Sequence, residues 1–262
     1  MINAIIYLIV FAVVQIFTSL IIHNGYELIA GYAATDTTTL LITDTVVSSV
    51  IIMGIFLWLR WCEVSRGYVQ SRPWGTLTWC AVASVGAIIP STFMQEMLPT
   101  LPNLVETEFD MILRSRWGYF AIGLLAPVCE ELVFRGAILR SLLRWSCPAD
   151  NRNPGGHWLA IAISAVLFAL AHFNPAQMPH ALLVGMLLGW MYYRTDSVVP
   201  SVVYHWVNNS VAYVQYNLYP DPNMKLIDIF GSQRTVAAAV VFSLFILLPA
   251  LYQLNICLKK AK

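Results

Sequence analysis

The feature that most constrains this chain is a series of long apolar stretches separated by short loops. A transmembrane helix requires roughly 20 mostly apolar residues. Eight stretches meet or nearly meet that length: about 2–22, 40–60, 75–98, 117–143, 158–174, 178–193, 197–217 and 235–258. Only 11% of the residues are charged, whereas soluble domains average about 25%. Because lipid leaves open strand edges unsatisfied, the sequence predicts an all-α polytopic membrane protein with about eight transmembrane helices.

Composition and loop length narrow the organisation further. All loops are short, so residues 1–262 are predicted to form a single integral membrane domain. The net charge of +1 indicates no nucleic-acid partner. The five cysteines are scattered without a CxxC pair, which argues against a disulfide framework or a zinc knuckle. The N-terminal stretch has no basic region and no cleavage site, so we expect a retained first span rather than a signal peptide.

The lysines and arginines predict the orientation in the membrane. With the N-terminus in the cytoplasm, the inside loops contain ten Lys and Arg residues. The outside loops contain four, which are Arg114, Arg116, Lys225 and Arg234. The positive-inside rule therefore predicts that both termini are cytoplasmic. The compact size suggests a bacterial plasma membrane. The longest loop, 99–116, is expected to be either an amphipathic helix on the outer surface or an ordinary polar loop.

Ionisable residues within the spans mark candidate functional groups, because burying charge in lipid is costly. Glu131 and Arg135 are four residues apart, so they share a helix face and can form an ion pair. Glu130 is turned about 100° away from Glu131 and has no partner in its own helix. A carboxylate without an ion-pair partner in its own helix suits general acid–base chemistry.

Two further spans supply imidazoles and a carboxamide. Glu130 and His172 lie 22 and 20 residues from the centre of the loop near residue 152, so they can face each other. His205 and Asn209 are four residues apart on one helix face. Counted from its preceding turn, His205 lies only about 15 Å into its span. It is therefore expected to be shallower than Glu130, unless the helix of Glu130 projects into the cytoplasm.

Small and polar residues of the sixth span receive a structural interpretation. Gly185 and Gly189 form a GxxxG pattern, which predicts close helix packing. His180, at the start of the same span, is interpreted as a packing or turn histidine, with a supporting position next to the catalytic residues as the alternative. Asn208 accompanies Asn209 in the seventh span without an assigned role.

Three motifs in order resemble a known family. EELVFR (130–135) is an EExxxR motif, FALAH (168–172) is FxxxH and HWVNN (205–209) is HxxxN. Together they resemble the CAAX protease and bacteriocin-processing family of intramembrane endopeptidases. That family includes the eukaryotic enzyme that trims prenylated Ras-type C-termini. The motifs define a core of about 117–217, and the resemblance outside them is general.

The resemblance implies a fold and a mechanism. About eight helices would surround a conical, cytoplasm-facing catalytic cavity. Glu130 would act as the general base with His172 as its partner, and together they would polarise a water. His205 and Asn209 would form the oxyanion hole.

Supporting roles follow from the same resemblance. Glu131 and Arg135 would hold the site, and Phe168 would pack beside the catalytic histidine one turn away. The expected partners are membrane lipid and a peptide or protein substrate that can carry a lipid.

Alternatives remain open at this level. No cofactor is favoured, but zinc could be held by Glu130, His172 and His205, although the chain has no HExxH motif. Intramembrane Glu–His chains also serve proton-coupled transporters. A non-catalytic membrane immunity or binding protein would retain the same fold.

Overall fold

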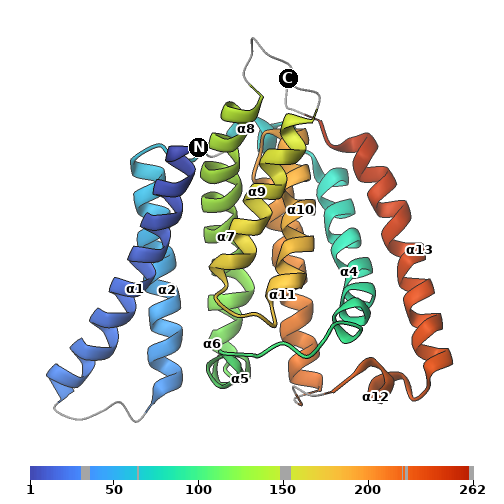
Figure 1. Cartoon of the computed structure of the whole chain (residues 1–262), viewed down its shortest axis with the longest axis horizontal. Helices are drawn as coiled ribbons and strands as arrows, with labels where there is room; N and C mark the ends of the chain where they lie inside the picture. The colour runs from blue at the N-terminus through green and yellow to red at the C-terminus, as the bar shows by residue number, and fades with distance from the viewer. Residues whose placement is uncertain (31–35, 64, 148–154, 220, 222–223, 260–262) are drawn as a thin grey trace.

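The computed structural model describes residues 1–30, 36–63, 65–147, 155–219, 221 and 224–259. These residues form helices joined by short loops, with both chain ends near the same end of the bundle (Figure 1). The first half contains α1 (Ile2–Ala30), α2 (Thr37–Trp58), α3 (Arg66–Gln70), α4 (Trp74–Glu96), α5 (Glu106–Arg114), α6 (Arg116–Gly118), the π-helix η1 (Tyr119–Leu125) and α7 (Ala126–Glu131). The second half contains the π-helix η2 (Leu132–Leu139), α8 (Arg140–Ser146), α9 (Gly156–Ala171), α10 (Met178–Thr195), α11 (Val199–Leu218), α12 (Leu226–Phe230) and α13 (Gln233–Cys257).

The predicted all-helical membrane class is confirmed. Each predicted apolar stretch coincides with a helix or with consecutive helical segments. Within the described part of the chain, four helices (α1, α2, α4 and α13) are long and apolar enough to cross a membrane. By contrast, α9 has only 16 residues, and the range 117–143 is divided among several segments. The number of about eight transmembrane helices is therefore not confirmed.

The helix that carries the EExxxR motif is not a regular α-helix. Two π-helical segments, η1 and η2, flank α7 on either side. Pro127, near the start of α7, has no N–H to donate to the preceding turn and its ring crowds that turn. The missing hydrogen bond and the crowding by the proline ring favour the wider π-helical turn of η1, which directly precedes α7. Such π segments occur frequently at functional sites.

Small residues allow the inner helices to approach closely. A Cβ on Gly185 would lie 3.1 Å from the Cα of Ala165, and one on Gly189 would lie 2.9 Å from Ile161. These contacts bring α10 against α9 and confirm the packing role predicted for the GxxxG pattern. Buried serine hydroxyls add bonds between helices, since Ser84 donates to the Tyr204 carbonyl at 3.0 Å and Ser164 donates to the Phe134 carbonyl at 3.3 Å.

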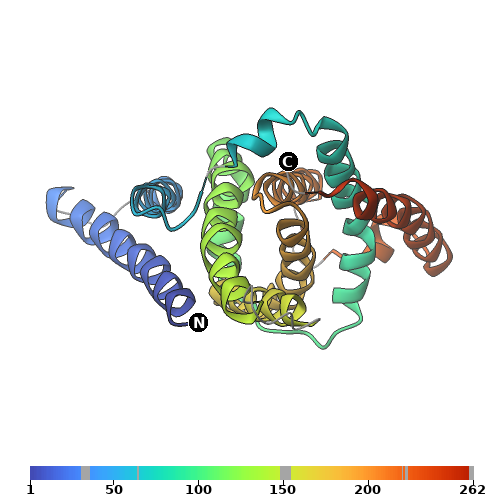
Figure 2. The same ribbon diagram turned by 90° about the horizontal axis from the view of Figure 1, so that it is seen from above.

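The helices are arranged as an inner group with outer helices on two sides. Seen from above, α7, α9, α10, α11 and α4 gather at the centre, α1 and α2 lie on one side, and α13 lies on the other (Figure 2). The outer helix α13 packs along α4. Its outward face is apolar and exposed, as expected for a surface in contact with lipid.

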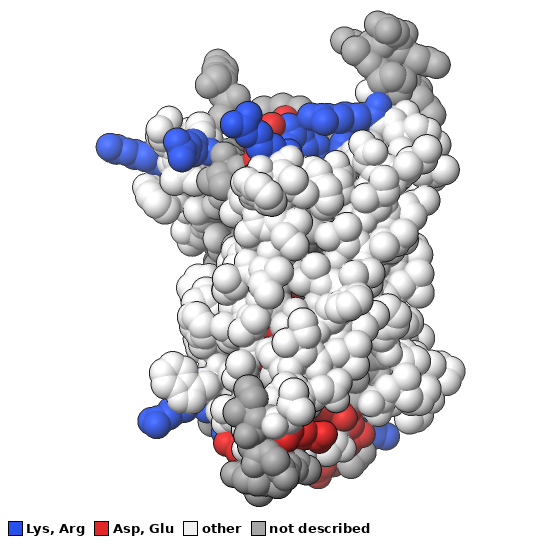
Figure 3. Space-filling model, turned by 90° about the vertical axis from the view of Figure 1, so that its left-hand side faces the viewer, with Lys and Arg blue, Asp and Glu red and all other residues white. Residues whose placement is uncertain are grey.

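Charge is distributed unequally between the two ends of the bundle. Lys and Arg gather at one end and most Asp and Glu at the other, with an uncharged band between them (Figure 3). The basic end is the end of the bundle where α1 begins and α13 ends. The acidic end is the opposite one, where α5 and α12 lie (Figure 1). Of the two expectations for 99–116, the helical one is correct over α5, whose first turn contains Glu106 and Glu108.

Candidate active site

The buried centre of the site is the ion pair between Glu131 and Arg135. Both side chains are fully buried, and Arg135 Nη1 donates to Glu131 Oε1 at 2.7 Å. Arg135 Nη2 also donates to the carbonyl of Gly185 at 3.3 Å. The guanidinium lies over the ring of Phe168, 4.3 Å from its centroid. Arg135 thus links η2 to α9 through Phe168 and to α10 through Gly185.

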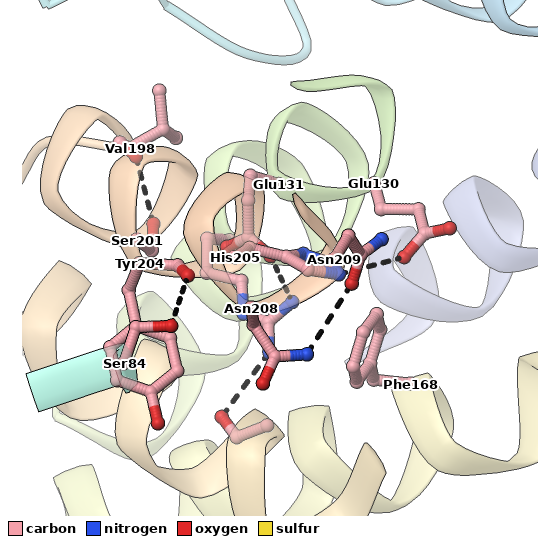
Figure 4. A network of polar contacts seen from close by, with 12 residues as sticks. Ser84, Glu130, Glu131, Phe168, Val198, Ser201, Tyr204, His205, Asn208 and Asn209 are labelled. Carbon is pink, nitrogen blue, oxygen red and sulfur yellow. Dashed lines mark hydrogen bonds and ion pairs between the residues drawn. The ribbon is translucent and has the colours of Figure 1, made fainter. Parts of the chain in front are cut away.

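His205 is held by this pair. Its Nδ1 lies 2.9 Å from Glu131 Oε1, and the ring is 5% exposed. Because an ionised carboxylate can only accept, Nδ1 carries the hydrogen and donates it to Glu131. Nε2 of the same ring then points toward Glu130, with 3.8 Å between Nε2 and Glu130 Oε2 (Figure 4). The hydrogen bond to Glu131 therefore fixes the orientation of the imidazole, and its Nε2 is directed at the Glu130 carboxylate.

The short distance between Glu130 and His205 answers the question of depth that counting residues left open. Counting from the preceding turn placed His205 shallower than Glu130, whereas the two side chains lie at the same depth. The helix of Glu130 continues as α8 to Ser146, so it extends further toward the basic end than the span assigned to it.

Glu130 and Glu131 are neighbours in sequence but differ in environment. The Glu131 side chain is completely buried, whereas that of Glu130 is 25% exposed. Glu130 Oε2 has no hydrogen-bond partner among the described residues, and its 3.8 Å separation from His205 Nε2 is too long for a direct hydrogen bond. Glu130 is thus a carboxylate with free acceptor capacity, as the helix geometry predicted.

His172 presents one free nitrogen. Its Nδ1 lies 2.9 Å from the carbonyl oxygen of Phe168, and a carbonyl can only accept, so Nδ1 carries the hydrogen and Nε2 remains an acceptor in the neutral ring. The Phe168 ring meets the His172 ring edge-on at 4.9 Å and the His205 ring at 5.8 Å. Phe168 thus packs against both imidazoles.

Asn209 is oriented by groups that the sequence did not assign to the site. Its amide nitrogen donates to the carbonyl of Ile122 at 3.0 Å, and its oxygen accepts from Asn208 at 3.4 Å. The Asn208 amide also lies 3.5 Å from His180 Nε2. His180 is therefore a neighbour of the site, which agrees with the second of its two interpretations. The repeated asparagine in HWVNN was the available signal, but helix spacing turns Asn208 about 100° away from Asn209.

The site lines a cavity of about 790 Å³. All four predicted catalytic residues line it, together with the neighbours just described: Glu130, His172, His205, Asn209, Phe168, Asn208, His180 and Ile122. The three motifs thus come from three separate helices to one surface. Glu131 and Arg135 lie behind this surface, where they contact its residues without lining the cavity.

The cavity extends toward the acidic end of the bundle. Its further lining includes residues of α4, α5, α11 and the segment around α12: Gln95, Glu108, Tyr219, Asp221 and Ile229. No described residue of the loops at the basic end lines it. The sequence predicted cytoplasmic termini, and the resemblance implied a cytoplasm-facing cavity. Both can hold only if the cavity opens at the end of the bundle where the termini lie. The cavity extends toward the other end, so the two predictions exclude each other.

The groups named as alternative zinc ligands do not form a metal centre in the described part of the chain. No set of three or more His, Cys, Asp or Glu side chains there is arranged to hold a metal ion. Nδ1 of His172 and Nδ1 of His205 are both engaged by protein oxygens. Glu130 and the two Nε2 atoms remain as possible donors.

Comparison with known proteins confirms the resemblance predicted from the motifs. Residues 113–211 match the family described as type II CAAX prenyl endopeptidase Rce1-like, and this range contains all three motifs. The chain is also similar to the UPF0177 protein YxdF of Lactococcus lactis, with 27% identity over 148 residues. That alignment covers 56% of this chain and 65% of the relative, so it spans somewhat less than two thirds of the relative's length. No solved structure matches the chain.

Proposed function

We propose that this membrane protein is a CAAX-type intramembrane endopeptidase in which Glu130 activates water to hydrolyse a peptide bond. The single observation that carries the proposal is the free Glu130 carboxylate, which lies in the cavity 3.8 Å from an imidazole fixed by a buried ion pair. The match of residues 113–211 to a family of CAAX prenyl endopeptidases supports a protease. The remaining steps follow from the chemistry of the residues.

Glu130 acts as the general base. A water bound between Glu130 and the acceptor Nε2 of His172 attacks the carbonyl carbon of the peptide bond, and Glu130 takes the proton. When the carbon–nitrogen bond of the tetrahedral intermediate breaks, the protonated Glu130 gives this proton to the departing amine. General acid–base catalysis of this kind contributes about 10²–10⁴ in rate.

His205 and Asn209 stabilise the oxyanion. Asn209 uses one amide hydrogen for the Ile122 carbonyl and has a second hydrogen to donate. His205 donates from Nε2 when its ring is protonated, since Nδ1 already donates to Glu131. Preorganised donors aimed at developing charge often supply the largest part of catalysis.

The mechanism requires no metal. This part of the proposal is supported by the described residues, among which no group of three or more His, Cys, Asp or Glu side chains is arranged to hold a metal ion. Incubation with a chelator and subsequent dialysis is expected to leave activity within about twofold. A loss of activity that zinc restores would favour the zinc alternative.

A defined experiment tests the activity. Purified protein in lipid nanodiscs is incubated with a library of synthetic peptides, and the products are identified by mass spectrometry. Wild type is expected to generate new termini, and Glu130→Gln to reduce their rate of formation by about 10²–10⁴. Glu106→Gln is the matched control, because Glu106 is an exposed glutamate that does not line the cavity. Equal product formation by Glu130→Gln and wild type would contradict the proposal.

A further inference from the structure

The direction in which the cavity opens determines which peptides can reach the catalytic groups. From Glu130 and His205 the cavity continues past Gln95 and Glu108 to Asp221, at the end of the bundle that carries α5 and α12. At the opposite end, Glu131, Arg135 and the residues packed on them close the site, because these side chains are fully buried. A substrate therefore enters from the α5–α12 end.

The charges indicate which side of the membrane this end faces. The described residues at the basic end include seven Lys and Arg residues in the loops and helix ends: Arg60, Arg66, Arg72, Arg140, Arg144, Arg194 and Lys259. The α5–α12 end has four, and it also carries most of the Asp and Glu residues of the chain (Figure 3). The positive-inside rule places the basic end in the cytoplasm.

The lining of the cavity also has one sign of charge. Asp44, Glu108 and Asp221 line it in addition to Glu130, and no Lys or Arg is among its described lining residues. A cleft with carboxylates of one sign and low-dielectric walls attracts cations and repels anions. The lining thus favours a ligand with positive charge over one with negative charge.

Unpaired polar atoms indicate that the ligand is polar as well. Among the described residues, four buried polar side-chain atoms without a hydrogen-bond partner belong to the cavity lining: Asp44 Oδ1, Glu130 Oε2, His180 Nδ1 and the Tyr216 hydroxyl. Such groups require donors and acceptors. The main chain of an extended peptide supplies both, whereas an acyl chain supplies neither.

We infer that the cavity receives its substrate from the non-cytoplasmic side of the membrane, as an extended peptide segment that carries Lys or Arg. The inference rests on the proposed function and adds the side of entry and the charge of the substrate. It resolves the conflict between the two sequence predictions in favour of cytoplasmic termini. On this inference the cavity does not face the cytoplasm, contrary to what the family resemblance implies.

Chemical labelling tests the side of entry independently of proteolysis. Glu108→Cys and Arg144→Cys place thiols at exposed positions of the two ends, and the five native cysteines are buried or half-buried. Intact spheroplasts that express each variant are treated with a membrane-impermeant maleimide, with detergent-lysed cells as the reactivity control. We expect labelling of Glu108→Cys in intact spheroplasts and of Arg144→Cys only after lysis. The reverse pattern, or equal labelling of both variants in intact spheroplasts, would overturn the inference.

Charge reversal at the cavity mouth tests the preference for basic peptides. Glu108→Lys is expected to lower the cleavage rate of Lys- and Arg-containing library peptides by about tenfold, corresponding to roughly 1.4 kcal/mol. Glu106→Lys adds the same charge to the same helix outside the cavity, so its rate is expected to stay within about twofold of wild type. Equal rates for the two variants would contradict the charge preference.

The two proposals can fail separately. If Glu130→Gln and wild type cleave equally, the proposed function fails whatever the labelling shows. If Glu130→Gln abolishes cleavage but Glu108→Cys reacts only after lysis, the protease proposal stands and the entry from the non-cytoplasmic side is rejected.

Discussion

The inner and outer helices of this protein differ in what specifies their positions. On the outer helix α13, Phe242 and Phe245 are 69% and 70% exposed, as expected for side chains that face lipid. In the inner segment η2, Phe134 and Ile138 are 1% and 0% exposed and pack beside a buried ion pair. In lipid, apolar surface gains little from burial, so packing depends on small residues and polar pairs. The inner region is thus specified by particular residues, whereas the outer face requires only that its side chains be apolar.

The largest expected effect comes from breaking the ion pair at the centre of the inner region. Arg135→Met leaves Glu131 buried without its cation, and losing one partner of a buried pair costs about 3–5 kcal/mol. We expect a strong loss of folded protein, measured as thermal unfolding of the purified protein in detergent.

The double variant Glu131→Gln with Arg135→Met serves as the control, because it leaves no unpaired charge. It is expected to recover part of the stability. A single variant as stable as wild type would show that the pair does not hold the inner helices.

A smaller loss is expected from enlarging Gly185. A side chain there would meet the Cα of Ala165 and the ring of Phe168, and overpacking of this kind costs about 1–3 kcal/mol. Gly185→Val is therefore expected to lower the thermal midpoint. Phe245→Leu, on the exposed face of α13, is expected to change stability by less than about 0.5 kcal/mol. Equal shifts for the two variants would remove the distinction between inner and outer helices.

Within the site, Asn208 is expected to act as a positioning residue. Asn208→Ala removes the hydrogen bond to the Asn209 oxygen, and a typical intramolecular hydrogen bond contributes about 0.5–1.5 kcal/mol. We expect kcat to fall by up to about tenfold while KM changes little, because Asn209 is proposed to act in the transition state. Steady-state kinetics on a cleaved library peptide measure both constants. A change confined to KM would assign Asn208 to substrate binding instead.

The smallest effect is expected at the exposed basic end, from the ion pair between Glu63 and Arg140. The hydrogen bond from Arg140 holds the pKa of Glu63 below its ordinary value of 4.5. Because the folded pKa is lowered, the pair stabilises the fold above the ordinary pKa, and this contribution is lost as the pH falls through the folded pKa.

For an exposed pair the contribution is at most about 1 kcal/mol. Glu63→Gln is therefore expected to lower stability slightly at pH 7 and to match wild type near pH 3. Thermal unfolding at both pH values measures the difference. A variant that differs from wild type equally at both values would exclude this ion pair as the cause.

The sequence predicted features that depend on spacing within one helix. The Glu131–Arg135 pair and the close approach at Gly185 follow from helical periodicity, so both were accessible without a structure. The contact of His205 with both glutamates required the packing of two helices against each other. Residue counting alone left its depth open, because the tilt and the ends of the helices are not specified by the sequence.

The acidic mouth of the cavity was not predicted. Glu108 and Asp221 are more than 100 residues apart, and single polar residues so far apart in sequence carry no signal that they share a surface. The π-helical segments were also missed, since periodicity arguments assume a regular α-helix. These are the features in which tertiary packing, rather than local sequence, decides the arrangement.

The most direct test of the central claim compares protein termini in cells. Cells that express wild type or Glu130→Gln at equal levels are analysed by mass spectrometry of protein C-termini. We predict a set of termini that is present with wild type and lost with Glu130→Gln. Identical sets, with Glu130→Gln still abolishing a cellular phenotype of the protein, would contradict proteolysis and favour transport or binding.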